Sequence, residues 1–127
     1  MSNPIVLIFV ESRYKVNRKR MKATVAKTLD EQSVMTPVEV SVAIVGDRKM
    51  KVLNKKYRDK EETTNVLSFS LAEGKKMQMA SGIVKLGDIV ISYPQVIKEA
   101  VVEEVLVDEK VDELLAHGLR HLLGIHH

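Results

Sequence analysis

The sequence lacks cysteine and tryptophan altogether, and aromatic residues make up only 4% of it. The absence of cysteine excludes disulfide bonds and thiolate metal ligands, and it fits a reducing compartment such as the cytoplasm. The scarcity of aromatic rings argues against extensive stacking on nucleic-acid bases. What remains for chemistry is a large complement of charged residues, 29% of the chain, and four histidines.

Long apolar runs are missing as well. The N-terminal apolar stretch extends only from Ile5 to Val10, with no basic region before it and no small-residue cleavage site. It fits neither a secretory signal nor a membrane span, so we expect a cytoplasmic protein. The 127 residues, of which 45% are hydrophobic, suffice for a buried core. We expect a single domain over residues 1–127.

The net charge of +3 conceals an uneven distribution. Residues 1–60 carry 14 lysines and arginines against 6 acidic residues, whereas residues 61–127 carry 6 against 11. The basic residues concentrate in two segments, residues 13–27 and 48–60. This polarity favours a polyanionic partner that meets one side of the molecule, although two solvated helices with lysine-rich faces produce the same pattern.

The pattern of apolar residues predicts an α+β fold. Residues 38–45 alternate between apolar and other side chains, which is typical of a strand with one buried face. The predicted strands are residues 4–10, 38–45, 66–70 and 86–92, and the predicted helices are residues 14–31, 48–57 and 94–104, followed by a last helix that Gly124 ends. This order predicts a small mixed four-stranded sheet packed with helices.

Several connections and helix ends are also predicted. Residues 71–85 are expected to form a polar loop, and the Gly87-Asp88 pair is typical of a turn at the start of the fourth strand. Asp47 and Asp108 are predicted to be the N-caps of the second and the last helix, because a short carboxylate accepts hydrogen bonds from the first turn.

All four histidines fall within the last eleven residues, in the segment HGLRHLLGIHH. His117 and His121 are four residues apart, so they project from one side of the last helix, beside its apolar stripe. Gly124 readily adopts positive φ, which allows the chain to turn and His127 to return as a third ligand. Three imidazoles around one ion, with a position left open, are typical of a catalytic zinc site. The alternative interpretation is a helix with surface histidines that ends in the remainder of a purification tag. A tag would consist of consecutive histidines, which this spacing does not match.

The spacing H-x3-H-x2-G-x2-H is also that of the metzincin proteases, whose motif is HExxHxxGxxH. The glutamate of that motif is the general base, and here Gly118 occupies its position. Because proton transfer contributes about 10²–10⁴-fold to such rates, peptide hydrolysis is disfavoured. A Lewis-acidic ion would still polarise a phosphoryl oxygen, and phosphodiester hydrolysis suits the basic half of the chain better.

The histidine segment resembles the signature HGxxHLxGYDH of the YbeY family. Residues 53–60 and 64–69 are similar to the family's LNxxYRxKDxPTDVLSFP, and residues 86–92 resemble its LGDIVIS strand. The three motifs occur in the right order and cover most of residues 46–127. The resemblance implies a metal-dependent, single-strand-specific endoribonuclease that acts in ribosomal RNA maturation and ribosome quality control.

Carried over position by position, the resemblance implies that His117, His121 and His127 are the metal ligands and that Arg58 is the active-site arginine. A guanidinium group is a planar, permanently charged fork of donors, which suits a scissile phosphate. Asp88 is either an acceptor that orients a ligand histidine or, as we favour, a structural residue at the start of its strand.

The chain departs from the family pattern at several positions. Ile125-His126 replaces the Tyr-Asp pair before the last histidine, Asn65 replaces an aspartate, and Ser70 replaces a proline. The first change removes a carboxylate and adds an imidazole beside the third ligand. Whether His126 or a terminal carboxylate joins the metal shell is left open, as is the metal, although three imidazoles suit zinc best.

Two functions from different classes follow from these features. The first is the endoribonuclease, and the alternative is a non-catalytic RNA-binding ribosome-assembly factor with a structural metal. Both have single-stranded or ribosomal RNA as a partner, and the resemblance implies a small-subunit ribosomal protein and an assembly GTPase as further partners. A degenerate metallopeptidase is a weaker third hypothesis, because no carboxylate can be assigned to its site.

Overall fold

The computed structural model describes residues 4–11, 13–58, 65–70, 79–80 and 82–124, and for residues 57, 58, 79 and 80 the description covers the backbone alone. These residues form β1 (Ile5–Val10), α1 (Arg18–Glu31), β2 (Val38–Val45), α2 (Asp47–Arg58), β3 (Val66–Ser70), β4 (Met79–Ala80), β5 (Ile83–Ser92), α3 (Tyr93–Glu103) and α4 (Val107–Leu122).

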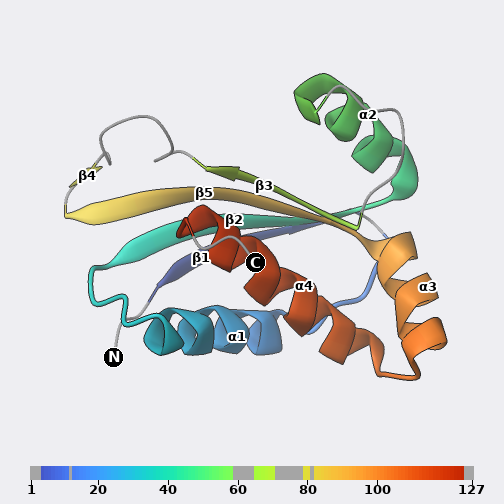
Figure 1. Cartoon of the computed structure of the whole chain (residues 1–127), viewed down its shortest axis with the longest axis horizontal. Helices are drawn as coiled ribbons and strands as arrows, with labels where there is room; N and C mark the ends of the chain where they lie inside the picture. Colours follow the sequence, from blue (N-terminus) through green and yellow to red (C-terminus); the bar gives the residue numbers. More distant parts are fainter. Residues whose placement is uncertain (1–3, 12, 59–64, 71–78, 81, 125–127) are drawn as a thin grey trace.

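The strands form one mixed sheet in the order β1-β2-β5-β3, and the two-residue β4 also pairs with β5. β1, β2 and β5 run parallel, whereas β3 runs antiparallel to β5. α1 and α4 lie against one face, which we call the inner face, and α2 lies on the opposite side at one end of the sheet (Figure 1). We call that second side the outer face. The α+β architecture and the mixed sheet with four main strands are therefore confirmed.

Alternate residues of β2 build the inner face. Val40, Val42 and Ile44 are at most 1% exposed, because side chains along a strand alternate between faces and these point into the layer under α1 and α4. Their neighbours on β5, Ile89 and Ile91, are fully buried as well. Burial of each such side chain stabilises the fold by about 1.5–3 kcal/mol, so this layer supplies much of the core.

α4 packs its apolar stripe onto this face, with Leu115 and Leu119 fully buried. The helix comes close to the sheet at Gly118, where an added Cβ would lie 2.9 Å from Ile89 Cγ2 and 3.1 Å from Ser68 Oγ. The Ser68 hydroxyl donates a hydrogen bond of 3.3 Å to the Gly118 carbonyl oxygen. Glycine at this position therefore allows the helix to rest directly on β3 and β5.

A buried lysine fixes α4 against α3. Lys110 is 4% exposed, and its ammonium group lies 2.8 Å from carboxylate oxygens of both Glu103 and Glu113 and 3.3 Å from Glu99 Oε1. Burial lowers the pKa of Lys110, but the hydrogen bonds to the three glutamates outweigh it and hold the pKa above its ordinary value. The lysine is therefore charged in the folded protein and joins the two helices.

On its opposite side, α4 is joined to α1. Arg20 Nε donates to Asp112 Oδ2 at 2.9 Å, and Thr24 Oγ1 donates to Asp112 Oδ1 at 2.9 Å. The hydrogen bond to Asp112 raises the pKa of Arg20. α4 is thus held on both flanks by polar contacts and underneath by apolar packing.

Several predicted boundaries were wrong. The first helix begins at Arg18 rather than residue 14, because Asn17 caps it by accepting a hydrogen bond from the Arg20 amide. Asp108 is not the cap of α4 but lies in its first turn, where Glu109 accepts a hydrogen bond from the Leu106 amide. Asp47 is the first residue of α2 rather than its cap.

The predicted loop over residues 71–85 contains β4 and the first residues of β5. Gly87 and Asp88 lie in the middle of β5 rather than in a turn, beside an irregularity in the pairing with β2 between Glu39 and Val40. Gly87 has φ of 141°, and a Cβ there would collide with the carbonyl oxygen of Phe69. The glycine therefore serves the close approach of β3, not a chain reversal.

No helix in the described part of the chain is long and apolar enough to cross a membrane.

Candidate active site

α4 brings two of the three predicted metal ligands together. His117 and His121 are half-buried, and their ring centroids lie 4.6 Å apart with 51° between the ring planes. The separation follows from their spacing of four residues, which places them on adjacent turns of one helix face. The predicted placement of the two histidines on one side of the helix is confirmed. Their role as metal ligands stays a prediction.

The pair lies on the α3 flank of the helix rather than on the α1 flank. His117 follows Lys110 by seven residues, two helical turns, so the histidines continue along the side of α4 that carries the lysine cluster. Asp112, which contacts α1, lies on the other flank. The turns that carry the two histidines are therefore positioned by the Lys110 contacts at one end and by the contact of Gly118 with the sheet at the other.

The third predicted ligand, His127, and its neighbour His126 lie outside the described residues. Within the described ranges no group of three histidines, cysteines or carboxylates is arranged to hold a metal ion. The side chains of His117 and His121 still fit the implied metal. Zinc is bound in helical sites by the imidazole nitrogens of two histidines four residues apart. The two residues would supply part of a ligand set.

Arg58 is the last residue of α2, and its side chain lies outside the description. α2 carries six basic residues and a single acidic one, Asp47. The helix is anchored by apolar contacts: Met50 is fully buried in a cluster with Val45, Leu67 and Val90 on the outer face. The basic side chains of α2 between Arg48 and Lys56 are exposed, and the helix lies at one end of the sheet on the outer side (Figure 1).

Asp88 is not placed to orient a ligand histidine. Its strand neighbour Ile89 points to the inner face and meets Gly118 of α4, so Asp88 points to the outer face. The expectation that it marks the start of a strand is also wrong, because β5 begins at Ile83. Asp88 is exposed, and a different role is argued for it below.

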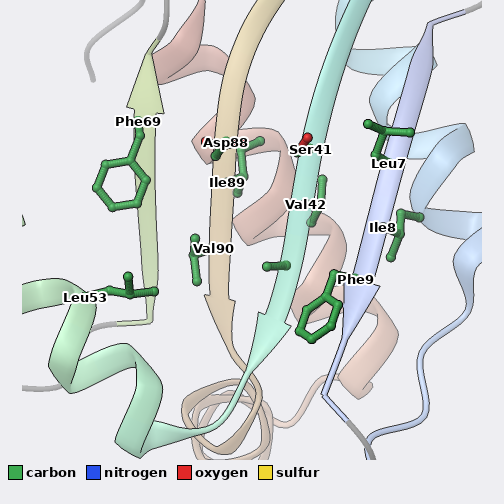
Figure 2. Close-up of a pocket in the computed structure, with 11 residues that line it drawn as sticks. Leu7, Ile8, Phe9, Ser41, Val42, Leu53, Phe69, Asp88, Ile89 and Val90 are labelled. Carbon is green, nitrogen blue, oxygen red and sulfur yellow. The ribbon is translucent and has the colours of Figure 1, made fainter.

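The outer face contains a hollow of about 530 Å³. Figure 2 shows its lining side chains on β1, β2, β5, β3 and α2, with Phe9 and Phe69 on the two outermost of these strands. Leu7 and Phe9 are 51% and 55% exposed. Sequence reasoning missed this hollow, although the polar residues Glu39 and Ser41 in the alternating pattern of β2 were the available signal.

Sequence reasoning also missed the link between β3 and the helices. The Asn65 amide donates to both carboxylate oxygens of Glu99, at 3.1 and 3.2 Å. Glu99 also contacts Lys110, so one carboxylate joins the residue before β3 to the helix that carries the histidines. An aspartate at position 65, as in the family pattern, would place two carboxylates in contact, and this explains the asparagine.

Comparisons with known proteins agree with the motifs. The family described as Endoribonuclease YbeY matches residues 8–127. A protein named Endoribonuclease YbeY from Thermodesulfovibrio yellowstonii is 38% identical over 120 residues, which cover 93% of this chain and 73% of the relative. One of the same name from Syntrophus aciditrophicus is 32% identical over 127 residues, 100% of this chain and 78% of the relative.

A further relative of that name, from Anaeromyxobacter sp., is 44% identical over 89 residues, and the match spans 70% of this chain but only 44% of the relative. Among solved structures, the solution structure of TM1509 from Thermotoga maritima superimposes with a TM-score of 0.59 at 22% identity, covering 93% of this chain and 71% of that chain. This likeness shows a shared fold. The family match extends from β1 to the histidine segment, and the chain therefore belongs to the Endoribonuclease YbeY family.

Proposed function

We propose that this chain is a metal-dependent endoribonuclease that cleaves single-stranded RNA and acts in ribosomal RNA maturation. Its family membership supports the reaction class, since relatives over most of the chain are named endoribonucleases. The observation that carries the proposal is the pair of half-buried imidazoles, His117 and His121, 4.6 Å apart on one side of α4. Residues of this type at this spacing suit a divalent ion rather than a packing role.

His117 and His121 would hold the ion together with His127, most simply as zinc. A divalent ion in such a site supplies Lewis acidity to a phosphate ester and to water. The protein's own contribution is to fix the two imidazoles, through the packing of Gly118 on Ile89 and through Lys110. A site of this kind loses activity when its ligands move by about 1 Å, so both contacts matter for the rate.

Arg58 would bind the scissile phosphate. Its guanidinium group offers two parallel donors to phosphate oxygens and stabilises the charge that develops on them. Lys55 and Lys56, which lie on the same helix next to Arg58, would attract the strand and guide it, together with Lys60. No side chain is assigned as general base.

The wider setting is also part of the proposal. Action on ribosomal RNA is implied by the family resemblance, as are a small-subunit ribosomal protein and an assembly GTPase as partners. A reducing cytoplasm suits a chain without cysteine.

The proposal is tested by cleavage of a labelled single-stranded RNA by zinc-loaded protein. The assay is run in parallel on wild type, on Arg58→Ala and on Arg48→Ala, which removes an arginine from the other end of α2. We expect wild type and Arg48→Ala to cut, Arg58→Ala to be at least about 10²-fold slower, and a chelator to abolish cutting. A duplex of the same sequence should resist cleavage.

Each contrary outcome has a distinct meaning. Equal cleavage by wild type and Arg58→Ala, or cleavage that survives the chelator, would indicate a contaminating nuclease and overturn the proposal. Binding of RNA by all three proteins without cleavage would support the non-catalytic assembly factor instead.

A further inference from the structure

The hollow on the outer face has an ordered floor. Pairing between the strands aligns two rows of outward side chains across β1, β2, β5 and β3. One row is Leu7, Ser41, Asp88 and Phe69, and the next row is Phe9, Ala43, Val90 and Leu67. Side chains in one row are about 5 Å apart from strand to strand, so each row forms a continuous surface. The second row is entirely apolar, whereas the first has two polar groups at its centre.

Those two polar groups have no partner within the protein that the structure describes. Neither the Asp88 carboxylate nor the Ser41 hydroxyl makes a hydrogen bond or an ion pair with any described residue. They are direct neighbours across β2 and β5 and line the same hollow. A carboxylate on an apolar floor that contributes nothing to the fold is a typical orienting group of a ligand site.

The walls of the hollow differ in character from its floor. Both phenylalanines of the chain line it, Phe69 directly beside Asp88 on the edge strand and Phe9 on β1 (Figure 2). Leu53 of the basic helix α2 forms part of the wall, and the Lys49 ammonium group lies 5.8 Å from the centroid of the Phe9 ring. The hollow thus combines apolar and aromatic surface, a carboxylate at its floor and cationic groups at its rim.

The charges around the hollow limit which class of ligand it can bind. A purely anionic ligand is repelled by Asp88, and a basic peptide is repelled by α2, which has six basic residues. A nucleotide avoids both repulsions. Its anionic phosphate can lie near the basic helix, while its base is flat, apolar on its faces and able to donate hydrogen bonds to the carboxylate. Among the bases, guanine presents the N1–H and the N2 amino group side by side, which matches the two oxygens of one carboxylate.

We propose that Asp88 and Ser41 form a guanine-preferring base subsite on the outer face, with Phe69 packed against the base and Lys49 near its phosphate. The inference rests on the proposed function, because it makes the hollow a binding site for an unstacked base of the RNA substrate. β3 is an edge strand, with the hollow on its outer side and α4 on its inner side. A single strand that wraps this edge can place one guanine in the hollow while its backbone reaches the histidines.

The subsite is tested by binding of mononucleotides, which needs no cleavage. Guanosine, inosine, adenosine, cytidine and uridine 5′-monophosphates are titrated into the whole chain, and backbone amide shifts are followed by NMR. We expect GMP to shift the amides of Asp88 and Ser41 saturably. IMP, which lacks the N2 amino group, should bind more weakly, and AMP, which presents an acceptor where guanine has N1–H, should bind weakest of the purines.

Two variants of the same face separate recognition from general electrostatics. Asp88→Asn exchanges a carboxylate oxygen for an amide donor, so it should lose GMP affinity about 10–100-fold and prefer xanthosine monophosphate, which has a carbonyl in place of the N2 amino group. Glu39→Gln removes an equal charge from β2, one pair further along the outer face and outside the lining of the hollow. It should bind GMP as wild type does.

Binding of all nucleotides alike, or a loss of GMP affinity in Glu39→Gln equal to that in Asp88→Asn, would overturn the subsite. Saturable binding in the hollow of a lysine- and leucine-rich peptide in preference to GMP would overturn it as well and would indicate a protein partner. If RNA is cleaved without preference for guanine, the subsite fails while the proposed function stands. If GMP binds as expected but RNA is not cleaved, the subsite stands and the proposed function fails.

Discussion

The two faces of the sheet are built from the same strands but differ in almost every physical respect. On the inner face Val42 and Ile44 of β2 are at most 1% exposed under α1 and α4. On the outer face Leu7 and Phe9 of β1 are more than half exposed, and Ser41 and Asp88 have no partner among the described residues. Because strand side chains alternate, neighbouring residues in the sequence serve different tasks. Most of the buried core lies on the inner face, and the part of the outer face beyond the cluster around Met50 is available for binding.

The largest contrast is expected for truncation of leucines. Leu119→Ala removes a fully buried side chain of α4 and should lower the free energy of unfolding by about 2–5 kcal/mol. Leu7→Ala, at a half-exposed position of the outer face, should lower it by about 0.5 kcal/mol or less. Urea denaturation of both variants measures the difference. Equal losses would contradict the division between the faces.

Loss of the buried lysine should have the next largest effect. Lys110→Met leaves three glutamates without their common partner, but these are 28–59% exposed and partly screened, so we expect a loss of about 1–3 kcal/mol. Since the pKa of Lys110 is raised in the folded state, its contribution is present below about pH 10 and is lost as the pH rises through the raised value.

Thermal denaturation of wild type and Lys110→Met as a function of pH checks this sign. The stability difference between the two proteins should be constant between about pH 7 and 9 and shrink at more alkaline pH. Lys98→Met, which changes an exposed lysine on α3, is the matched control and should show no such difference. A difference that grows with pH would show that Lys110 does not carry the charge assigned to it.

A smaller effect is expected where α4 touches the sheet. In Gly118→Ala the added methyl group meets Ile89 and Ser68, and the cost of overpacking exceeds the gain in helix propensity by about 1 kcal/mol. The helix must shift away from the inner face, so zinc affinity should fall more than stability does. Isothermal titration with zinc, beside urea denaturation, separates the two quantities. Unchanged zinc affinity would show that this contact does not position the histidines.

The smallest effect on stability is expected at the polar centre of the outer face. Ser41→Ala removes a hydroxyl that makes no hydrogen bond to a described residue, so the free energy of unfolding should change by less than about 0.5 kcal/mol. Ser68→Ala, on the inner face of β3, removes a hydroxyl bonded to Gly118 and should cost about 1 kcal/mol. A larger loss for Ser41 than for Ser68 would reverse the comparison.

The sequence predicted the inner face better than the rest of the molecule. The alternation of residues 38–45 and the stripe that includes Leu115 and Leu119 are periodic signals, and both are confirmed because burial imposes that periodicity. Helix ends were less predictable, since α1 starts after the capping residue Asn17 and α4 starts after Leu106, which makes no side-chain cap hydrogen bond. The two-residue β4 has no periodic signal of its own.

The candidate site was predictable only where a local spacing determines it. The pairing of His117 with His121 follows from one helical turn. The contacts of Lys110 with Glu99 and Glu103 on α3 depend on how two helices pack, although a lysine in line with an apolar stripe is a signal of a buried pair. The placement of Asp88 beside Ser41 depends on strand register between segments more than 40 residues apart, which no local pattern reveals.

The most direct test of the proposed metal site is the zinc content of His121→Ala. Purified wild type, His121→Ala and His126→Ala are loaded with zinc, desalted and analysed by mass spectrometry under non-denaturing conditions. We expect one ion per chain in wild type and in His126→Ala and none in His121→Ala, whose melting temperature without metal should equal that of wild type. A full complement of zinc in His121→Ala would contradict the assignment of the α4 histidines as metal ligands.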